Sequence, residues 1–156
     1  STEANSVYTQ QELEMLAPLK GISLFGEAVS SHEDIPQAYE ALKQNNIQYL
    51  ITTADNTISL HLSDLLGLAM PDMIPLIGTD IENTRDGAVA SLSVDYELIA
   101  AETGRLALAV CRGIVPDQQE TLYFNTDIIS VNTQSATELQ IDIPQSIIDK
   151  ADYIFP

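Results

Sequence analysis

Polar side chains stand at the ends of the strands that this sequence predicts. Short groups of Ser, Thr, Asn and Asp follow successive apolar runs, and a further serine lies near the end of the fourth run. In open α/β sheets, ligands bind beyond the carboxyl ends of the strands, so the pattern predicts a small-molecule site there. The candidate ligand-binding residues are Ser30, Ser31, Asp55, Asn56, Thr57, Thr79, Asp80 and Ser91.

The residue types at these strand ends suit an ammonium group better than a phosphate. A phosphate site would use glycines and a lysine, and the sequence contains no Gly-rich loop and no Walker motif. Each residue taken alone is also a good helix N-cap, worth about 1 kcal/mol, so a purely structural role stays open for every one. Asp55 could serve both purposes, with one oxygen capping a helix and the other facing the ligand.

Catalytic arrangements are not evident in the sequence. His32 and His61 belong to different predicted elements, and no Ser, His and Asp stand in a known motif. The acids that follow His32 are consecutive residues, which rarely converge on one metal ion. We therefore expect no catalytic residue, no metal and no cofactor. A receiver-like or enzymatic domain stays open as an alternative, and phosphorylation of Asp55 by acetyl phosphate would support it.

Apolar runs alternate with helical patterns through the first two thirds of the chain. This rhythm is typical of βα units and predicts a Rossmann-like parallel sheet flanked by helices. Ile99, Thr103, Leu106 and Val110 share one face of the last of these helices, and Cys111 beside them is expected to be a buried, inert thiol. The strands are predicted at 23–29, 47–52, 74–77 and 88–92, and the helices at 8–20, 36–44, 57–69 and 96–112, with turns at 83–87.

The pattern changes after Pro116. Only short elements are expected there: extended segments at 123–124 and 128–131, and short helices near 136–139 and after 144. Residues 114–156 are therefore interpreted as an appendage to the α/β unit of residues 1–113.

The net charge of −17, from 23 acidic and 6 basic residues, limits the partners of this 156-residue chain. Nucleic acids and anionic lipids both require Lys and Arg, so neither is expected as a partner. The charge permits a cationic ligand or a basic protein partner, although acidic surfaces also simply keep proteins soluble. No segment of the sequence has the length and apolar character of a membrane span or a signal peptide.

Several of these segments together resemble the ABC-transporter substrate-binding family that includes bacterial tryptophan- and aromatic-amino-acid-binding lipoproteins. The match covers essentially the whole chain, and it departs from the family pattern at Ala100, Glu102 and Gln140. The matching segments are Ala4-Asn5-Ser6, Ser30-Ser31 with Glu33, Ile35 and Ala38, Asp55-Asn56-Thr57, Pro75 to Asp80, Gly87-Ala88 to Tyr96 with Thr103, and Asn132 to Asp152.

This resemblance implies one lobe of a type I periplasmic-binding-protein clamshell, with ligand held between two lobes. Residues 1–113 would be the second lobe without its first strand, and residues 114–156 a segment that crosses back to the absent first lobe. Ser30, Ser31, Asp55, Asn56, Thr79 and Ser91 would then face the cleft, with Asp55 holding the amino group of an amino acid or related amine.

The same resemblance implies a location and a partner. The protein would be an extracytoplasmic component of a bacterial ABC importer, periplasmic or anchored as a cell-surface lipoprotein, that docks on a permease and does not itself insert in the membrane. A sensory input domain of a kinase, cyclase or transcription regulator is the alternative that stays open. The identity of the ligand does not follow from the sequence.

Overall fold

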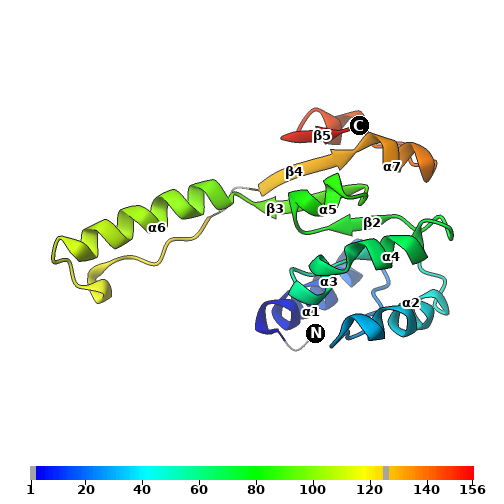
Figure 1. The fold of residues 1–156 in the computed structure, drawn as a ribbon, viewed down its shortest axis with the longest axis horizontal. Helices are drawn as coiled ribbons and strands as arrows, with labels where there is room; N and C mark the ends of the chain where they lie inside the picture. The colour runs from blue at the N-terminus through cyan, green and yellow to red at the C-terminus, as the bar shows by residue number, and fades with distance from the viewer. Residues whose placement is uncertain (1–2, 125–126) are drawn as a thin grey trace.

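A five-stranded sheet organises the computed structural model, which describes residues 3–124 and 127–156 (Figure 1). The strands lie side by side in the order of the chain. The first three are parallel, β4 runs antiparallel to β3, and β5 runs parallel to β4. The predicted α/β class is confirmed, and the sheet is mixed rather than wholly parallel. The strands are β1 (Leu50–Ile51), β2 (Leu76–Gly78), β3 (Ala90–Val94), β4 (Asp127–Asn132) and β5 (Tyr153–Phe155).

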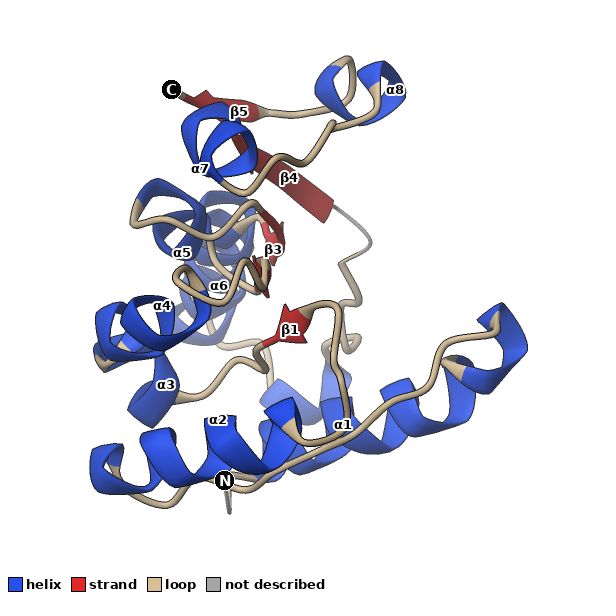
Figure 2. Ribbon diagram, turned by 90° about the vertical axis from the view of Figure 1, so that its right-hand side faces the viewer, coloured by secondary structure: helices blue, strands red, loops and turns tan. Residues whose placement is uncertain are grey.

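Helices connect these strands, and α3, α4 and α5 lie together on one side of the sheet in Figure 2. The α-helices are α1 (Ala4–Leu16), α2 (Ile35–Lys43), α3 (Asn56–Leu60), α4 (Leu62–Ala69), α5 (Ile81–Arg85), α6 (Tyr96–Cys111), α7 (Thr133–Glu138) and α8 (Gln145–Ile148). Short 3₁₀ turns are η1 (Pro18–Lys20), η2 (His32–Asp34) and η3 (Pro116–Gln118).

The main hydrophobic core lies where α2 and α4 pack against β1 and β2. The apolar residues of α4 recur at helical spacing, so Leu62, Leu65, Leu66 and Ala69 all point inward and are buried. Leu76 meets them from β2 with 1% of its surface exposed. Burial of this stripe is what fixes α4, and with it the turn that precedes the helix.

A second, smaller core forms where the chain returns after residue 126. Val89, Ala136 and Leu139 are buried together there. Because β4 pairs with β3 and β5 pairs with β4, residues 127–155 complete the same sheet. The chain thus leaves the sheet after β3 and returns to it at β4, and the division at residue 113 stays a prediction.

Helix α6 projects away from the rest of the molecule (Figure 1). Asp95 caps it by accepting the Leu98 N–H at 2.9 Å, as its place before the helix predicts. No residue of α6 is buried, although Ile99 and Leu106 share the predicted apolar face. The prediction of a core face was therefore wrong for this chain, and so was the prediction that Cys111 is buried. The pattern identifies a helix face, but nothing in the described chain buries it; Gln119 in the segment that follows the helix donates to the Leu106 carbonyl at 3.5 Å.

Three predicted elements differ in the structure. Residues 23–29 form no strand. The long helix predicted after Thr57 is split at His61, whose φ of −121° lies outside the helical region. The predicted turn at 83–87 falls partly within α5, because Asp80 and Asn83 form a capping box that starts a helix.

Within the ranges described, no helix combines the length and the apolar character that crossing a membrane requires.

Candidate functional site

The turn after β1 is built around the carboxylate of Asp55. This residue is 3% exposed, and its Oδ1 accepts the N–H groups of Thr57 at 2.9 Å and Ile58 at 3.2 Å. The extended backbone of Asp55, with φ −133° and ψ 128°, is typical of an N-cap residue and starts α3. The structure thus gives Asp55 the capping role that the sequence allowed.

The start of α1 closes over the same turn. Ser6, itself buried, donates its hydroxyl to Oδ2 of Asp55 at 3.3 Å. Asn5 donates its side-chain amide to the Ala54 carbonyl at 2.6 Å, and Asn56 donates to Oε1 of Glu3 at 3.2 Å. The strand-end pattern missed Glu3 and Ser6, because both precede every predicted strand. The available signal was the Ala4-Asn5-Ser6 segment at the start of a helix.

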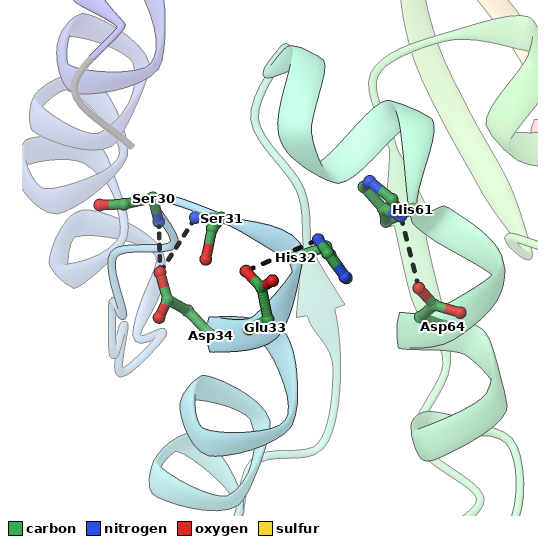
Figure 3. A network of polar contacts seen from close by, with 7 residues as sticks. All are labelled: Ser30, Ser31, His32, Glu33, Asp34, His61 and Asp64. Carbon is green, nitrogen blue, oxygen red and sulfur yellow. Dashed lines mark hydrogen bonds and ion pairs between the residues drawn. The ribbon is translucent and has the colours of Figure 1, made fainter.

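A second turn holds Ser30 and Ser31 (Figure 3). Both backbone N–H groups donate to Oδ2 of Asp34, each at 3.0 Å. These bonds favour the charged carboxylate and hold the pKa of Asp34 below its ordinary range. Ser31 also caps η2 in a capping box with Asp34, so this turn is preorganised by its own acid.

Two histidines join the Ser30–Ser31 turn to the helices that follow Asp55 (Figure 3). His32 on η2 stacks against His61 at the junction of α3 and α4, with ring centroids 4.8 Å apart and an interplanar angle of 20°. Glu33 lies 3.7 Å from the imidazole of His32, and Asp64 lies 3.5 Å from that of His61. In the described part of the chain, no group of three His, Cys, Asp or Glu side chains is placed to hold a metal ion.

The third turn, after β2, carries Thr79 and Asp80. Their N–H groups both donate to Oδ1 of Asn83, at 3.1 and 3.3 Å. Asn83 can fold back over the strand end because residue 78 is glycine; a Cβ there would lie 2.5 Å from the Asn83 Cβ. Burial, together with the charge of Glu82, raises the pKa of Asp80. The Thr79 hydroxyl is buried without a hydrogen-bond partner, which is costly unless something outside the described residues supplies one.

Ser91 lies inside the sheet rather than at its edge. Its side chain is 3% exposed, and its Oγ is 2.6 Å from the Oγ of Ser130 on β4. The Ser130 hydroxyl donates in turn to Thr84 at 2.8 Å. This chain of buried hydroxyls joins β3, β4 and α5.

The parallel pairing of β1 with β2 brings the Asp55 and Asp80 turns to the same edge of the sheet. The histidine stack ties the Ser30–Ser31 turn to this edge as well. The resulting surface combines hydroxyls, amides and carboxylates, which can hydrogen-bond and neutralise an amine-bearing molecule. A groove of about 780 Å³ runs along β1, and Asp55 is the one predicted site residue that lines it.

Comparison with known proteins identifies relatives of this chain. The family model for ABC transporter substrate binding proteins matches residues 1–154. A tyrosine-binding protein of Clostridioides difficile is 27% identical over 90% of this chain and 41% of its own length.

Two of the matching solved structures illustrate the shared fold. One is an ABC domain in complex with L-Trp from Streptococcus pneumonia, with a TM-score of 0.89 and 23% identity over 99% of this chain and 54% of that one. The other is a conserved domain protein from Vibrio cholerae, with a TM-score of 0.86 and 25% identity over 97% of this chain and 51% of that one. The chain thus spans about half the length of these proteins or less, and it belongs to the ABC transporter substrate-binding protein family.

Proposed function

We propose that this chain is one lobe of an extracytoplasmic solute-binding protein that captures an aromatic amino acid for an ABC importer. The observation that carries the proposal is the family match over residues 1–154, on a fold that a protein solved with L-Trp shares. The polar turns at one edge of the sheet also support it. They offer hydrogen-bond donors, and carboxylates that can pair with the ammonium group of an amino acid.

Asp80 also caps a helix, through its capping box with Asn83, but it is partly exposed and so is better placed than the buried Asp55 to offer a carboxylate to a ligand. Oδ1 of Asp55 caps α3, and its Oδ2 accepts from Ser6, so its first contribution is to hold the turn. Asp80 has a raised pKa because burial penalises its charge, and an ammonium group beside it would relieve that penalty. We assign Asp55 the positioning of the turn that presents Asn56 and Thr57, and Asp80 the charge that faces the ligand.

Two lobes are needed for tight binding in this proposal. Closed small-molecule sites bury about 70–90% of a ligand, and one open sheet edge covers a single side. Helix α6 and residues 112–124, none of which is buried in the structure, are the surface that would pack against the second lobe. The chain alone is therefore expected to bind amino acids weakly or not at all.

Isothermal titration of the two-lobed protein that contains this chain tests the proposal. L-Tryptophan and L-tyrosine are expected to bind, while indole-3-propionate, which lacks the amino group, binds much more weakly. Asp80→Asn should weaken L-tryptophan binding at least about tenfold, the loss expected for a charged hydrogen-bond partner. Asp152→Ala is the matched control, because its carboxylate accepts the Ile129 N–H in the C-terminal part of the sheet.

Different results would separate the parts of the proposal. Equal binding of L-tryptophan and indole-3-propionate would contradict a site for the ammonium group. Wild-type affinity in Asp80→Asn would mean that Asp80 does not contribute to that site. Binding without uptake, measured in proteoliposomes that hold the neighbouring permease, would contradict the importer role and leave the binding role intact.

A further inference from the structure

Asn83 packs against the turn that carries the carboxylate of Asp80. It is the third residue of α5, and it is 4% exposed. Its side-chain oxygen accepts the N–H groups of Thr79 and Asp80, at 3.1 and 3.3 Å. One amide oxygen of α5 therefore holds two consecutive peptide groups at the end of β2.

The space for this amide exists because residue 78 has no side chain. A Cβ at position 78 would lie 2.5 Å from the Asn83 Cβ and 2.7 Å from its Oδ1, closer than side chains in proteins approach one another. The φ of Gly78 is not positive, so its backbone conformation is open to other residues. The close approach of Asn83 is therefore what requires a glycine here.

Helix α5 is short, with five residues, yet buried contacts fix it to the sheet. Thr84 is 0% exposed, and its hydroxyl accepts that of Ser130 at 2.8 Å. The Thr84 carbonyl accepts the side-chain amide of Asn132 at 2.9 Å. Both partners belong to β4, so Asn83 is carried by an anchored helix and can hold the Thr79–Asp80 turn in one position.

The neutrality of residue 83 bears on Asp80 as well. A carboxylate would accept two N–H groups at least as strongly as an amide does, and Glu is common at this position of a capping box. It would also place a second negative charge beside Asp80. Burial and the charge of Glu82 on α5 already raise the pKa of Asp80. The amide of Asn83 holds the turn without opposing the ionisation of Asp80 further.

We propose that Asn83 is the positioning residue of the ligand site: its amide oxygen fixes the turn from which Asp80 presents its carboxylate, and its neutrality keeps that carboxylate ionised. This inference rests on the role of Asp80 in the proposed function. Asn83 acts through the turn and not by touching the ligand, because it is buried. Gly78 belongs to the same arrangement, since it makes room for the amide.

Titration of L-tryptophan into the two-lobed protein, combined with amide hydrogen exchange, tests this role. Asn83→Leu keeps a branched side chain and removes the acceptor. It should speed exchange of the Thr79 and Asp80 amides at least about tenfold and weaken binding at least about tenfold, as expected for Asp80→Asn. Leu139→Ala is the matched control, because it destabilises the smaller core and should leave the affinity unchanged.

Asn83→Asp separates the position of the turn from its charge. Because two N–H groups stabilise a negative charge at residue 83, Asp80 should then ionise only at higher pH. Exchange of the Thr79 and Asp80 amides should stay at the wild-type rate, while the pH below which the L-tryptophan affinity falls should rise by about one unit. Gly78→Ala displaces the amide instead and should reproduce the losses of Asn83→Leu.

The outcomes distinguish this inference from the proposed function. Wild-type affinity in Asn83→Leu, with binding weakened in Asp80→Asn, would overturn the positioning role alone. A loss in Leu139→Ala as large as that in Asn83→Leu would do the same, and so would a wild-type pH profile in Asn83→Asp, which decides the matter if Asn83→Leu does not fold. Wild-type affinity in Asp80→Asn would instead contradict the proposed function of Asp80, on which this inference rests.

Discussion

Helices α4 and α6 follow the same sequence rule with opposite structural results. Both place apolar residues on one face at helical spacing; α6 begins at the Asp95 cap, whereas α4 begins at His61, which makes no side-chain cap bond. In α4, Leu62, Leu65 and Leu66 are buried against β1 and β2, whereas in α6 no residue is buried and Val110, on the predicted apolar face, remains 41% exposed. The difference shows that periodicity determines which face is apolar, while burial depends on a partner that the helix itself does not specify.

The largest expected effect is the loss of unfolding free energy when a leucine of α4 is truncated, compared with truncation of a leucine of α6. Leu66→Ala should destabilise the chain by about 2–5 kcal/mol, because it leaves a cavity in a packed core. Leu108→Ala removes the same atoms from α6 and should change stability by less than about 0.5 kcal/mol. Urea unfolding followed by circular dichroism measures both. Equal losses would mean that α6 is packed in solution, and the comparison would no longer hold.

A smaller effect is expected at the two aspartates that cap helices. Asp55 is buried and caps α3 in the body of the molecule, so Asp55→Ala should lower the free energy of unfolding by about 1–2 kcal/mol. Asp95→Ala should fray the first turn of α6 and leave the global unfolding midpoint nearly unchanged, because no residue of α6 is buried in a core. Hydrogen exchange at Leu98 and urea unfolding report the local and global effects. A global loss for Asp95→Ala as large as that for Asp55→Ala would contradict this separation.

The sequence predicted the elements whose partners lie within the chain. The parallel strands near β1, β2 and β3, and the α2 and α4 helices, were found because their apolar residues pack against one another. The burial of α6 and the strand at 23–29 were predicted wrongly, because each pattern needs a neighbour that the described chain does not supply.

The candidate site was predictable in part for the same reason. The turns at Asp55 and Asp80 follow directly from local cap chemistry at strand ends. Ser6 hydrogen-bonds to Asp55, which is 49 residues away in the sequence. Ser91 hydrogen-bonds to Ser130, which the antiparallel pairing of β3 with β4 places opposite it. Neither contact has a local signature, since both depend on how distant segments pack.

A modest pH effect is expected at the Ser30–Ser31 turn, where Asp34 accepts two backbone N–H groups. The pKa of Asp34 is lowered from its ordinary value of 3.8 by the Ser30 and Ser31 N–H groups. A carboxyl whose folded pKa is depressed contributes stability above its unfolded pKa and loses it as pH falls through the folded value. Asp34→Ala should therefore be less stable than wild type at neutral pH, with the gap narrowing as pH falls from about 4 downward. The urea midpoint measured across this range checks it, and a gap that widened in acid would reverse the assigned sign.

Cys111, at the end of α6, gives the most direct test of the exposed helix with the least disturbance to the fold. It is the single cysteine of the chain and is exposed, so a thiol-specific reagent should label it in native buffer nearly as fast as in denaturant. Cys111→Ser should abolish the signal. Slow labelling that does not depend on protein concentration would mean that α6 folds back onto its own body. Slow labelling that appears only at high concentration would mean that a second copy covers it. Fast labelling at every concentration is the result expected of a helix whose partner lies outside this chain.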